Sequence, residues 1–367
     1  MQPRVVMLVD LDYFYAQCEE KRNPAIKEKP VVVCMYSGRS EDSGAVTTAN
    51  YIARKYGVKS GIPIFIAKKK LEGIDAVFLP ADFELYEQVS NRIMTILKDY
   101  ADRFEQVGID EAYLDVSQKV GGDFEAARQL AQDIKNDLKA REGMTGSIGV
   151  GPNKLIAKIA SDAQKPDGLT VVKPEMVEGF LTPLPVDRLI GVGKKTVEKM
   201  QTLEIRTIGE LARYDVQRLI DVFGKSLGTY FHCAASGVDD DPVQERGETE
   251  SVSRIATLKE NTRELPRILE KTDELCKDVH GGLIQRGVTF KTVGIYVVMA
   301  DMSVYNRSRT LESPTDSIEV LKSTVKELFE RFLDQSELEV RRVGVRISGF
   351  MRTQKSQRSL TEFLQPP

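Results

Sequence analysis

Apolar residues in the first 170 positions form two kinds of pattern, short continuous runs and stripes with helical spacing. Residues 4–10 form a continuous run, which is typical of a strand buried on both faces. Val89, Ile93 and Ile96 recur every three or four positions and predict an amphipathic helix over 83–104. The other predicted elements are a helix over 13–21, a strand over 29–36, a strand and helix within 45–57, a strand over 107–116, a helix over 123–142 and a strand over 146–151.

The order of these elements, strand–helix–strand–strand–helix–strand, predicts a ferredoxin-like, split βαβ sheet. The segment from about 22 to 78 interrupts this order, so we expect it to form a separate lobe. Asp12 is expected to cap the helix after the first strand, and Gly57 to end the helix of the inserted lobe. Short polar side chains favour helix N-caps, and glycine favours the position just past a helix end.

A purely helical pattern covers residues 175–236. Within it, "IGVGKKTVEKM" places Gly191 and Gly193 in a tight turn before a helix that begins near Lys194. This is the pattern of a helix-hairpin-helix, in which backbone N–H groups can meet a DNA phosphate. The turn is therefore a candidate DNA contact.

The segment 236–251 is acidic and poor in apolar residues, which predicts a solvated linker. After the linker, the strand–helix–strand–strand–helix–strand order returns up to about residue 352. We therefore expect a second split βαβ domain.

Basic residues of this second domain concentrate on its predicted strands: Arg307, Arg309, Arg341, Arg342 and Arg346. Within "RVGVRIS", the period of two puts the arginines on one face and Val343, Val345 and Ile347 on the other. This arginine face has two possible interpretations, a solubilising surface or a surface that binds the phosphates along a nucleic-acid backbone. The spacing of arginines over neighbouring strands favours the phosphate-binding surface.

Composition disfavours several kinds of active site. The four cysteines are far apart without a CxxC pair, and the two histidines lie in no motif. The sequence therefore has few residues suited to a zinc site, a redox disulfide or a serine-hydrolase site. The net charge of −3 does not exclude local nucleic-acid surfaces. The apolar run at residues 5–9 is too short for a secretion signal, and no stretch approaches the ~20 residues of a membrane span. We expect a cytoplasmic protein with no membrane partner.

The stretch "VGIDEAYLDV" places Asp110 and Glu111 inside an otherwise apolar segment. Burying one unpaired carboxylate costs several kcal/mol, and two neighbouring carboxylates also repel each other. In the predicted sheet, this segment is adjacent to the first strand, which ends at Asp10, and Gly108 allows a turn that brings the three acids together. Hard oxygen ligands without His or Cys suit Mg²⁺ or Mn²⁺. The alternative is a strand end with solvent-exposed acids.

Six stretches, taken together, resemble the Y-family (translesion) DNA polymerases of the archaeal DNA polymerase IV type. They are "VDLDYFYAQCEE", "KPVVVC", "SGRSEDSGAVTTANYIARKYGVKSGIP", "VGIDEAYLDV", "SIGVGPNKLIAKIASDAQKPDGL" and "IGVGKKTVEKM". The resemblance implies an α+β multidomain fold: a ferredoxin-like palm with inserted fingers, an all-helical thumb with a helix-hairpin-helix, and a split-βαβ little finger. Its implied limits are palm 1–21 and 79–174, fingers 22–78, thumb 175–236, linker 237–250, little finger 251–352 and a tail 353–367.

The resemblance also implies roles for single residues. Asp10, Asp110 and Glu111 match the metal-binding carboxylates, with the carbonyl of Leu11 as a further ligand and Glu111 as the residue usually named catalytic. Two Mg²⁺ ions are implied, with Mn²⁺ as a possible substitute. The implied triphosphate contacts are Tyr51, Arg54 and Lys165. Tyr15 matches the steric gate that excludes a ribose 2′-OH.

Further matches concern the base pair and the partners. Small residues are implied over the nascent base pair, at Ala45, Thr47 and Gly61, although Thr47 is bulkier than the smallest version. The candidate DNA contacts from the turn and strand patterns described above are Gly191, Gly193, Lys194, Arg307, Arg309, Arg342 and Arg346. The tail "QRSLTEFL" resembles a sliding-clamp peptide through Gln357, Leu360 and Phe363, while Leu364 replaces the usual second aromatic.

These features predict a monomeric, low-fidelity, template-directed DNA polymerase that uses primer–template DNA and dNTP, without a proofreading exonuclease. Two alternatives stay open. One is a DNA-binding scaffold tethered to the clamp with an inactive palm. The other is a palm-fold nucleotidyl cyclase, which needs no primer.

Overall fold

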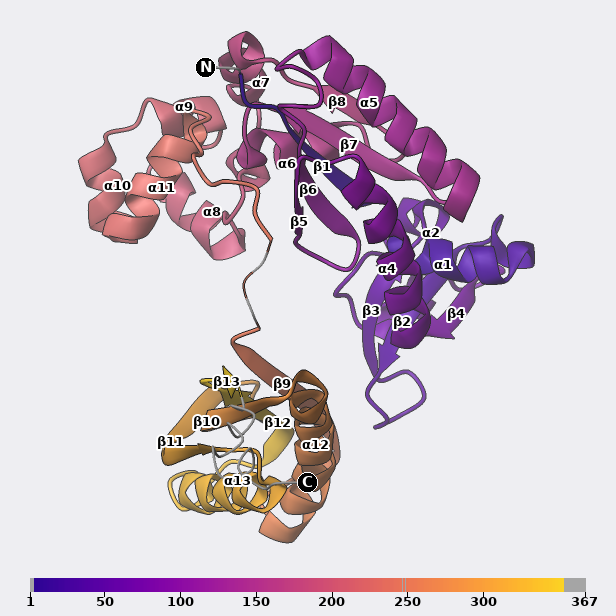
Figure 1. Cartoon of the computed structure of the whole chain (residues 1–367). Helices are drawn as coiled ribbons and strands as arrows, with labels where there is room; N and C mark the ends of the chain where they lie inside the picture. Colours follow the sequence, from indigo (N-terminus) through magenta and orange to yellow (C-terminus); the bar gives the residue numbers. More distant parts are fainter. Residues whose placement is uncertain (1–2, 246, 248, 353–367) are drawn as a thin grey trace, which may run out of the picture. The chain divides into compact units, whose positions relative to one another are not determined.

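A computed structural model describes residues 3–245, 247 and 249–352 of the chain (Figure 1). The chain divides into two compact units, which we describe in turn. The first contains residues 3–34, 46–62 and 66–245, and the second contains 35–45, 63–65, 247 and 249–352. Within these described ranges, no helix has the length and apolar character that crossing a membrane requires.

The first unit is built on a five-stranded sheet with the strand order β5-β6-β1-β7-β8. The strands are β1 (Val6–Leu11), β5 (Arg103–Gln106), β6 (Glu111–Asp115), β7 (Gly146–Gly151) and β8 (Leu169–Val171). The central strand β1 is antiparallel to both β6 and β7. This is the predicted split βαβ arrangement, extended at one edge by β8.

Helices cover both faces of this sheet, which explains why β1 is buried along its whole length. They are α1 (Phe14–Arg22), α4 (Phe83–Asp99), α5 (Phe124–Asp137), which continues into a π-helical turn (Leu138–Glu142), and α6 (Lys154–Ala163). Met7 and Val9 pack in the core that includes residues of α1, α4 and α5. Val6 and Leu8 point the other way and pack with Ala157 of α6.

The inserted segment contributes a smaller sheet in the order β3-β2-β4. Its elements are β2 (Val31–Tyr36), β3 (Gly44–Ala49), α2 (Tyr51–Lys55), α3 (Ile64–Lys70) and β4 (Val77–Pro80). Asn50 caps α2, since its side-chain oxygen accepts a hydrogen bond from the N–H of Ala53. This cap fixes the start of the helix that carries Tyr51 and Arg54.

Residues 177–235 are mainly helical, as predicted, and share an apolar core with residues of α6, among them Leu155 and Ile159. The α-helices are α7 (Val177–Leu181), α8 (Lys194–Thr202), α9 (Ile208–Ala212), α10 (Val216–Phe223) and α11 (Lys225–Ala235). Gly191 has φ of +83°, and Gly193 directly precedes α8, so the predicted turn is present. Buried Val192 anchors the turn, while Gly191, Gly193 and Lys194 are exposed.

The second unit contains a sheet in the order β11-β10-β12-β9. Its elements are β9 (Ser251–Thr262), α12 (Leu265–Arg286), β10 (Val288–Met299), β11 (Val304–Thr315), α13 (Ile318–Leu333), β12 (Val340–Ser348) and the short β13 (Met351–Arg352), which pairs with β10. Both helices share one apolar core with the sheet. The predicted second split βαβ domain is present.

The helix predicted over 83–104 ends at Asp99, since Arg103–Gln106 form β5, and two further local predictions were wrong. Asp12 does not cap α1, because Tyr13 occupies the N-cap position in a left-handed conformation and makes no side-chain cap. The carboxylate of Asp12 instead accepts hydrogen bonds from the Ser147 hydroxyl and the Asp167 N–H, both at 2.8 Å. The linker is not wholly solvated either. Val243 is fully buried, and Asp239 accepts a hydrogen bond from the N–H of Leu155 at the start of α6.

Candidate active site

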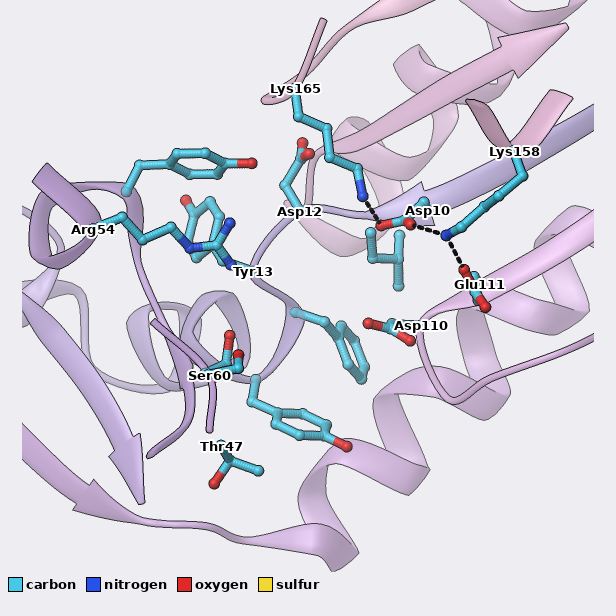
Figure 2. A pocket seen from close by; sticks show the side chains of 15 residues that line it. Asp10, Asp12, Tyr13, Thr47, Arg54, Ser60, Asp110, Glu111, Lys158 and Lys165 are labelled. Atoms are coloured by element: carbon cyan, nitrogen blue, oxygen red, sulfur yellow. Dashed lines mark hydrogen bonds and ion pairs between the residues drawn. The ribbon is translucent and has the colours of Figure 1, made fainter. Parts of the chain in front are cut away.

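A cavity of about 380 Å³ opens at the end of β1 in the first unit (Figure 2). It is lined by the ends of β1 and β6, the start of α1, β3, α2 and the region of α6. Most of the residues that the resemblance singled out in this unit line it: Asp10, Leu11, Tyr15, Thr47, Tyr51, Arg54, Asp110, Glu111 and Lys165. The fold therefore gathers residues that are up to 155 positions apart in sequence, from Asp10 to Lys165.

Strand pairing brings the three acids together. Asp10 lies opposite Glu111 in the β1–β6 ladder, and the N–H of Leu11 donates to the carbonyl of Asp110 at 2.9 Å. Asp110 itself lies in the bend before β6. A Cβ at Gly108 would come within 3.2 Å of side-chain atoms of both Asp110 and Glu111, so glycine leaves room for the two carboxylates in this bend.

Two ammonium groups neutralise part of this charge. The Lys158 Nζ lies 3.0 Å from Asp10 Oδ2 and 2.6 Å from Glu111 Oε2. The Lys165 Nζ lies 2.6 Å from the other oxygen of Asp10 and 2.9 Å from Asp162. Burial favours the neutral amine, but the neighbouring carboxylates together outweigh it and raise the pKa of both lysines. They are Asp10 and Glu111 for Lys158, and Asp10 and Asp162 for Lys165. Both side chains are therefore charged at neutral pH.

Asp110 has a different environment from its two neighbours. No ion pair involves it among the residues that the structure describes. Burial, followed by the charges of Asp10 and Glu111, raises its pKa to about 6. The site thus holds one carboxylate whose ionised form lacks the close cation that Asp10 and Glu111 have.

This shift predicts how stability depends on pH in the metal-free protein. The raised pKa means that ionised Asp110 destabilises the fold fully above about pH 6 and not at all below its ordinary pKa of 3.8. Asp110→Asn should therefore raise the free energy of unfolding at pH 7.5 by on the order of 2 kcal/mol, reduced for partial exposure. The gain should vanish near pH 4.

Urea unfolding in EDTA between pH 4 and 8 measures this effect. Asp240→Asn serves as a control, because Asp240 is an exposed acid of the same unit. Parallel pH profiles for the wild type and Asp110→Asn would contradict the predicted penalty.

The donor set fits a hard divalent cation. Carboxylate oxygens from three acids and the nearby backbone of Leu11 are the ligands that Mg²⁺ and Mn²⁺ prefer. In the described ranges, however, no three His, Cys, Asp or Glu side chains are already arranged to hold a metal ion. The ammonium of Lys158 lies between two of the candidate ligands, as the dashed lines of Figure 2 show.

Tyr15 enters the cavity from a stack of aromatic rings. Its ring lies parallel to that of Tyr86, with centroids 4.5 Å apart and planes 16° apart. Phe83 meets the ring of Tyr15 edge-on at 5.9 Å. Tyr86 is fully buried, and its hydroxyl donates to Glu19 at 2.6 Å. Tyr15 therefore rests on a fixed platform, which limits the positions its ring can take.

Tyr51 and Arg54 share one side of α2, as their spacing predicts. The Arg54 guanidinium carbon lies 4.7 Å from the centre of the Tyr51 ring, and its Nε donates to the carbonyl of Ala49 at 2.8 Å. Stacking and this hydrogen bond hold the guanidinium at the cavity, which the Lys165 side chain enters from above in Figure 2. Cations from two separate elements therefore line the same cavity.

The three small residues of the inserted segment are not all at the cavity. Thr47 lines it, and its hydroxyl is buried without a hydrogen-bond partner in the described part of the chain. Gly61 is exposed and is not among the lining residues, although its neighbour Ser60 is. Ala45 belongs to the second unit, so its proximity to the base pair stays a prediction.

Sequence reasoning missed Lys158 and Ser60. Lys158 follows Lys154 by four residues, the spacing that places two side chains on one helix face. The three neighbouring acids indicated that a counter-charge was needed, but nothing in the sequence indicated that this helix supplies it. Ser60 lies in a loop, and no pattern in the sequence distinguishes it.

The arginines of the second unit lie on two faces of its sheet. Arg346 is exposed and pairs across strands with Gly294, on the face away from the core. Arg307 and Arg309 instead pair with buried Ile295 and Val293, so they point to the helix side at the edge strand. The single arginine face suggested by the sequence is therefore divided, although Val343, Val345 and Ile347 are buried as predicted.

Contacts with α13 hold these two edge arginines. Arg309 forms an ion pair with Glu327, and Arg307 lies over the ring of Phe332. The Nε of half-buried Arg342 has no hydrogen-bond partner among the described residues. The candidate clamp residues Gln357, Leu360, Phe363 and Leu364 lie outside the described residues.

Comparison with known proteins connects this geometry to a family. Family models match most of the chain: the impB/mucB/samB family over residues 9–162, its C-terminal domain over 249–361, and the DNA polymerase-iota thumb domain over 187–239. The chain is 48% identical over 364 residues to DNA polymerase IV of Nitrosopumilus maritimus, covering 99% of this chain and 100% of that protein. The chain belongs to the Y-family DNA polymerases.

Other relatives agree with this assignment. DNA polymerase IV of Methanosarcina acetivorans is 48% identical over 369 residues, covering 99% of this chain and all of that protein. Among solved structures, the Y-family DNA polymerase chimera Dbh-Dpo4(243-245)-Dbh aligns with a TM-score of 0.90 at 35% identity, over 95% of this chain and 100% of that one. The chain is thus a translesion-type DNA polymerase with palm, thumb and little-finger domains, and Y-family polymerases generally use divalent metal ions.

Proposed function

We propose that this Y-family polymerase copies DNA past damaged bases with low fidelity, by nucleotidyl transfer with two metal ions and without proofreading. One observation carries the proposal: three carboxylates and three candidate phosphate contacts, Tyr51, Arg54 and Lys165, line a single cavity. A cyclase could use the same palm. The likeness of the thumb and C-terminal domain to polymerase domains favours synthesis on a primer.

The metal ligands in this proposal are Asp10, Asp110, Glu111 and the Leu11 carbonyl, with two Mg²⁺ ions and Mn²⁺ as a substitute. Bound ions of this kind stabilise both the attacking and the leaving oxygen of a phosphoryl displacement. The primer 3′-oxygen forms a bond to the α-phosphorus of dNTP, pyrophosphate leaves, and the hydroxyl proton passes to solvent. Asp110, without a close cation of its own, is the acid that gains most from a bound ion.

The nucleotide is held at both of its ends. Arg54 and Lys165 supply positive charge for the triphosphate, and Tyr51 keeps the guanidinium in place by stacking. Tyr15, fixed on Tyr86, lies beneath the sugar and collides with a 2′-OH. Small residues over the base pair, Thr47 among them, leave space for altered bases, which lowers fidelity.

Primer–template DNA is the proposed macromolecular substrate. A neighbour that is 35% identical, with a TM-score of 0.68, is described as an insertion ternary complex of Dbh DNA polymerase. In this chain, the exposed turn at Gly191, Gly193 and Lys194 offers backbone N–H groups to a phosphate. In the little finger, the sheet face that carries Arg342 and Arg346 is the second proposed contact. Arg307 and Arg309, which lie on the helix side of the edge strand, remain separate proposed contacts.

Salt dependence distinguishes the proposed arginine contacts from other surface charges. Arg346→Ala and Arg342→Ala should each weaken binding to primer–template DNA and reduce the slope of log affinity against log salt by about 1. Fluorescence anisotropy over a salt series measures this slope. Arg267→Ala is the matched control, because exposed Arg267 on α12 forms an ion pair with Glu264 and neither residue touches a proposed contact. A slope unchanged from that of the wild type would remove that arginine from the contact surface.

The C-terminal residues Gln357, Leu360, Phe363 and Leu364 remain the proposed sliding-clamp peptide, and the polymerase is proposed to act as a monomer. Neither proposal depends on the described structure.

Primer extension by the wild-type chain with Mg²⁺ tests the proposed function. We expect extension on undamaged and abasic templates, and no shortening of a mismatched primer. If the folded protein binds DNA but extends no primer with Mg²⁺ or Mn²⁺, the scaffold interpretation replaces this one. Turnover of a nucleotide without primer and template would favour the cyclase.

A further inference from the structure

The ammonium of Lys158 occupies a place for which the proposed reaction has no stated use. It contacts Asp10 Oδ2 at 3.0 Å and Glu111 Oε2 at 2.6 Å, and thereby joins β1 to β6 (Figure 2). Its side chain is 25% exposed, compared with 10% for Asp10 and 27% for Glu111. Because solvent screens a partly buried ion pair less, the electrostatic attraction in this pair is stronger than in a pair on the open surface.

The backbone holds Lys158 in this position. A Cβ at Gly149 of β7 would lie 2.0 Å from the carbonyl oxygen of Ala157 and 2.3 Å from the N of Ser161. A Cβ at Gly151 would lie 2.7 Å from the Ile156 side chain. The missing side chains let α6 lie directly against β7, so Lys158 projects from a closely packed helix. Its contact with the acids is therefore a consequence of the fold.

Lys158 differs from the other lysines of this region. Lys165 binds the remaining oxygen of Asp10, and it also binds Asp162, which is not one of the proposed metal ligands. Lys154, one turn earlier on α6, forms an ion pair with Glu105 at 2.8 Å. Neither of these two residues lines the cavity. Lys158 alone of the three contacts two proposed metal ligands, and it does so through one oxygen of each.

We propose that Lys158 is an internal placeholder cation, which holds Asp10 and Glu111 together before a divalent ion arrives and releases them when the ion binds. The inference rests on the proposed metal site. Without any cation, the three neighbouring acids repel one another in a partly buried place. With Lys158 present, an arriving ion competes for the Asp10 and Glu111 oxygens. The lysine therefore preserves the site and weakens its affinity for metal in the absence of substrates.

Binding of Mn²⁺ to the full-length protein, followed by electron paramagnetic resonance without DNA or nucleotide, tests this competition. Lys158→Met removes the charge but keeps a long side chain, and we expect it to bind Mn²⁺ about tenfold more tightly than the wild type. Lys154→Met is the matched control, because it breaks an ion pair on the same helix outside the cavity. Its Mn²⁺ affinity should stay within about twofold of the wild type.

Thermal unfolding gives a second readout. Lys158→Met should have a lower melting temperature than the wild type in EDTA, and Mn²⁺ should restore it. The rise in melting temperature on adding Mn²⁺ should therefore be larger for Lys158→Met than for the wild type. Lys154→Met should lower both temperatures alike. If Lys158→Met does not fold, Lys158→Gln takes its place in both measurements. The placeholder proposal is wrong if Lys158→Met binds Mn²⁺ no more tightly than the wild type, and if its melting temperatures in EDTA and in Mn²⁺ differ by the same amount as those of the wild type.

Asp110→Asn separates failure of this inference from failure of the proposed metal site. If Asp110→Asn weakens Mn²⁺ binding while Lys158→Met leaves it unchanged, the metal site stands and only the placeholder is wrong. If Asp110→Asn has no effect on Mn²⁺ binding, the metal site itself is wrong, and the placeholder falls with it.

Discussion

Glu111→Gln is expected to reduce primer extension by about 10²- to 10³-fold, the scale of losing one charge-stabilising group from an active site. Glutamine keeps the size of the side chain and its place opposite Asp10 in the β1–β6 ladder, but it removes the charge. It therefore removes one proposed metal ligand, as well as one of the two acids that Lys158 contacts. Single-nucleotide incorporation under single-turnover conditions measures the loss.

Glu105→Gln is the matched control for this experiment. Glu105 is also a buried acid on a palm strand and is also paired with an α6 lysine, Lys154. It lies outside the cavity lining, so we expect stability to fall while the extension rate of the folded protein stays close to that of the wild type. Circular dichroism and DNA-binding assays establish that both variants are folded. Extension by Glu111→Gln near the wild-type rate would remove Glu111 from the reaction.

Tyr15→Ala is expected to admit ribonucleotides, raising the ratio of rNTP to dNTP incorporation efficiency by about 10²-fold or more. The reason is steric: removing the ring opens the space in which a 2′-OH is otherwise rejected. The measurement compares kcat/KM for one base as rNTP and as dNTP, on the same primer and template. A ratio, rather than a rate, separates loss of selectivity from a general loss of activity.

Tyr15→Phe is the control that keeps the ring. Phenylalanine preserves the stack on Tyr86 and the edge contact with Phe83, so selectivity should remain that of the wild type. If Tyr15→Ala still rejects ribonucleotides, another residue is the gate. If Tyr15→Phe also admits them, the hydroxyl and not the ring is responsible for the exclusion.

The arrangement of elements followed from periodicity because both sheets bury apolar residues in regular patterns. Val343, Val345 and Ile347 are buried as their alternation requires, and the helical stripe of α4 is buried at Val89 and Ile93. Removal of apolar surface from water is the main contribution that stabilises the fold. The spacing of apolar residues in the sequence shows directly which residues make this contribution.

The errors concern polar groups, whose partners lie far away in the sequence. Asp12 has the local features of a helix cap, but its oxygens bind Ser147 and Asp167, more than 130 positions away. Lys158 acquires its place only when α6 packs on β7. The side to which Arg309 points depends on strand register. Local patterns contain no information on such contacts, so these parts of the site required the structure.

The close packing of α6 on β7 also links groups that look independent. Lys154 and Lys158 lie on this one helix, and Lys165 follows its end by two residues. Any side chain at Gly149 forces the helix away from the sheet, because its Cβ would overlap with the backbone of α6. Such a displacement moves Lys154 and Lys158 together, and with them the positive charges that pair with Glu105, Asp10 and Glu111. Substitutions at Gly149 or Gly151, which do not line the cavity, would thus change the charge balance of the site by moving all of α6.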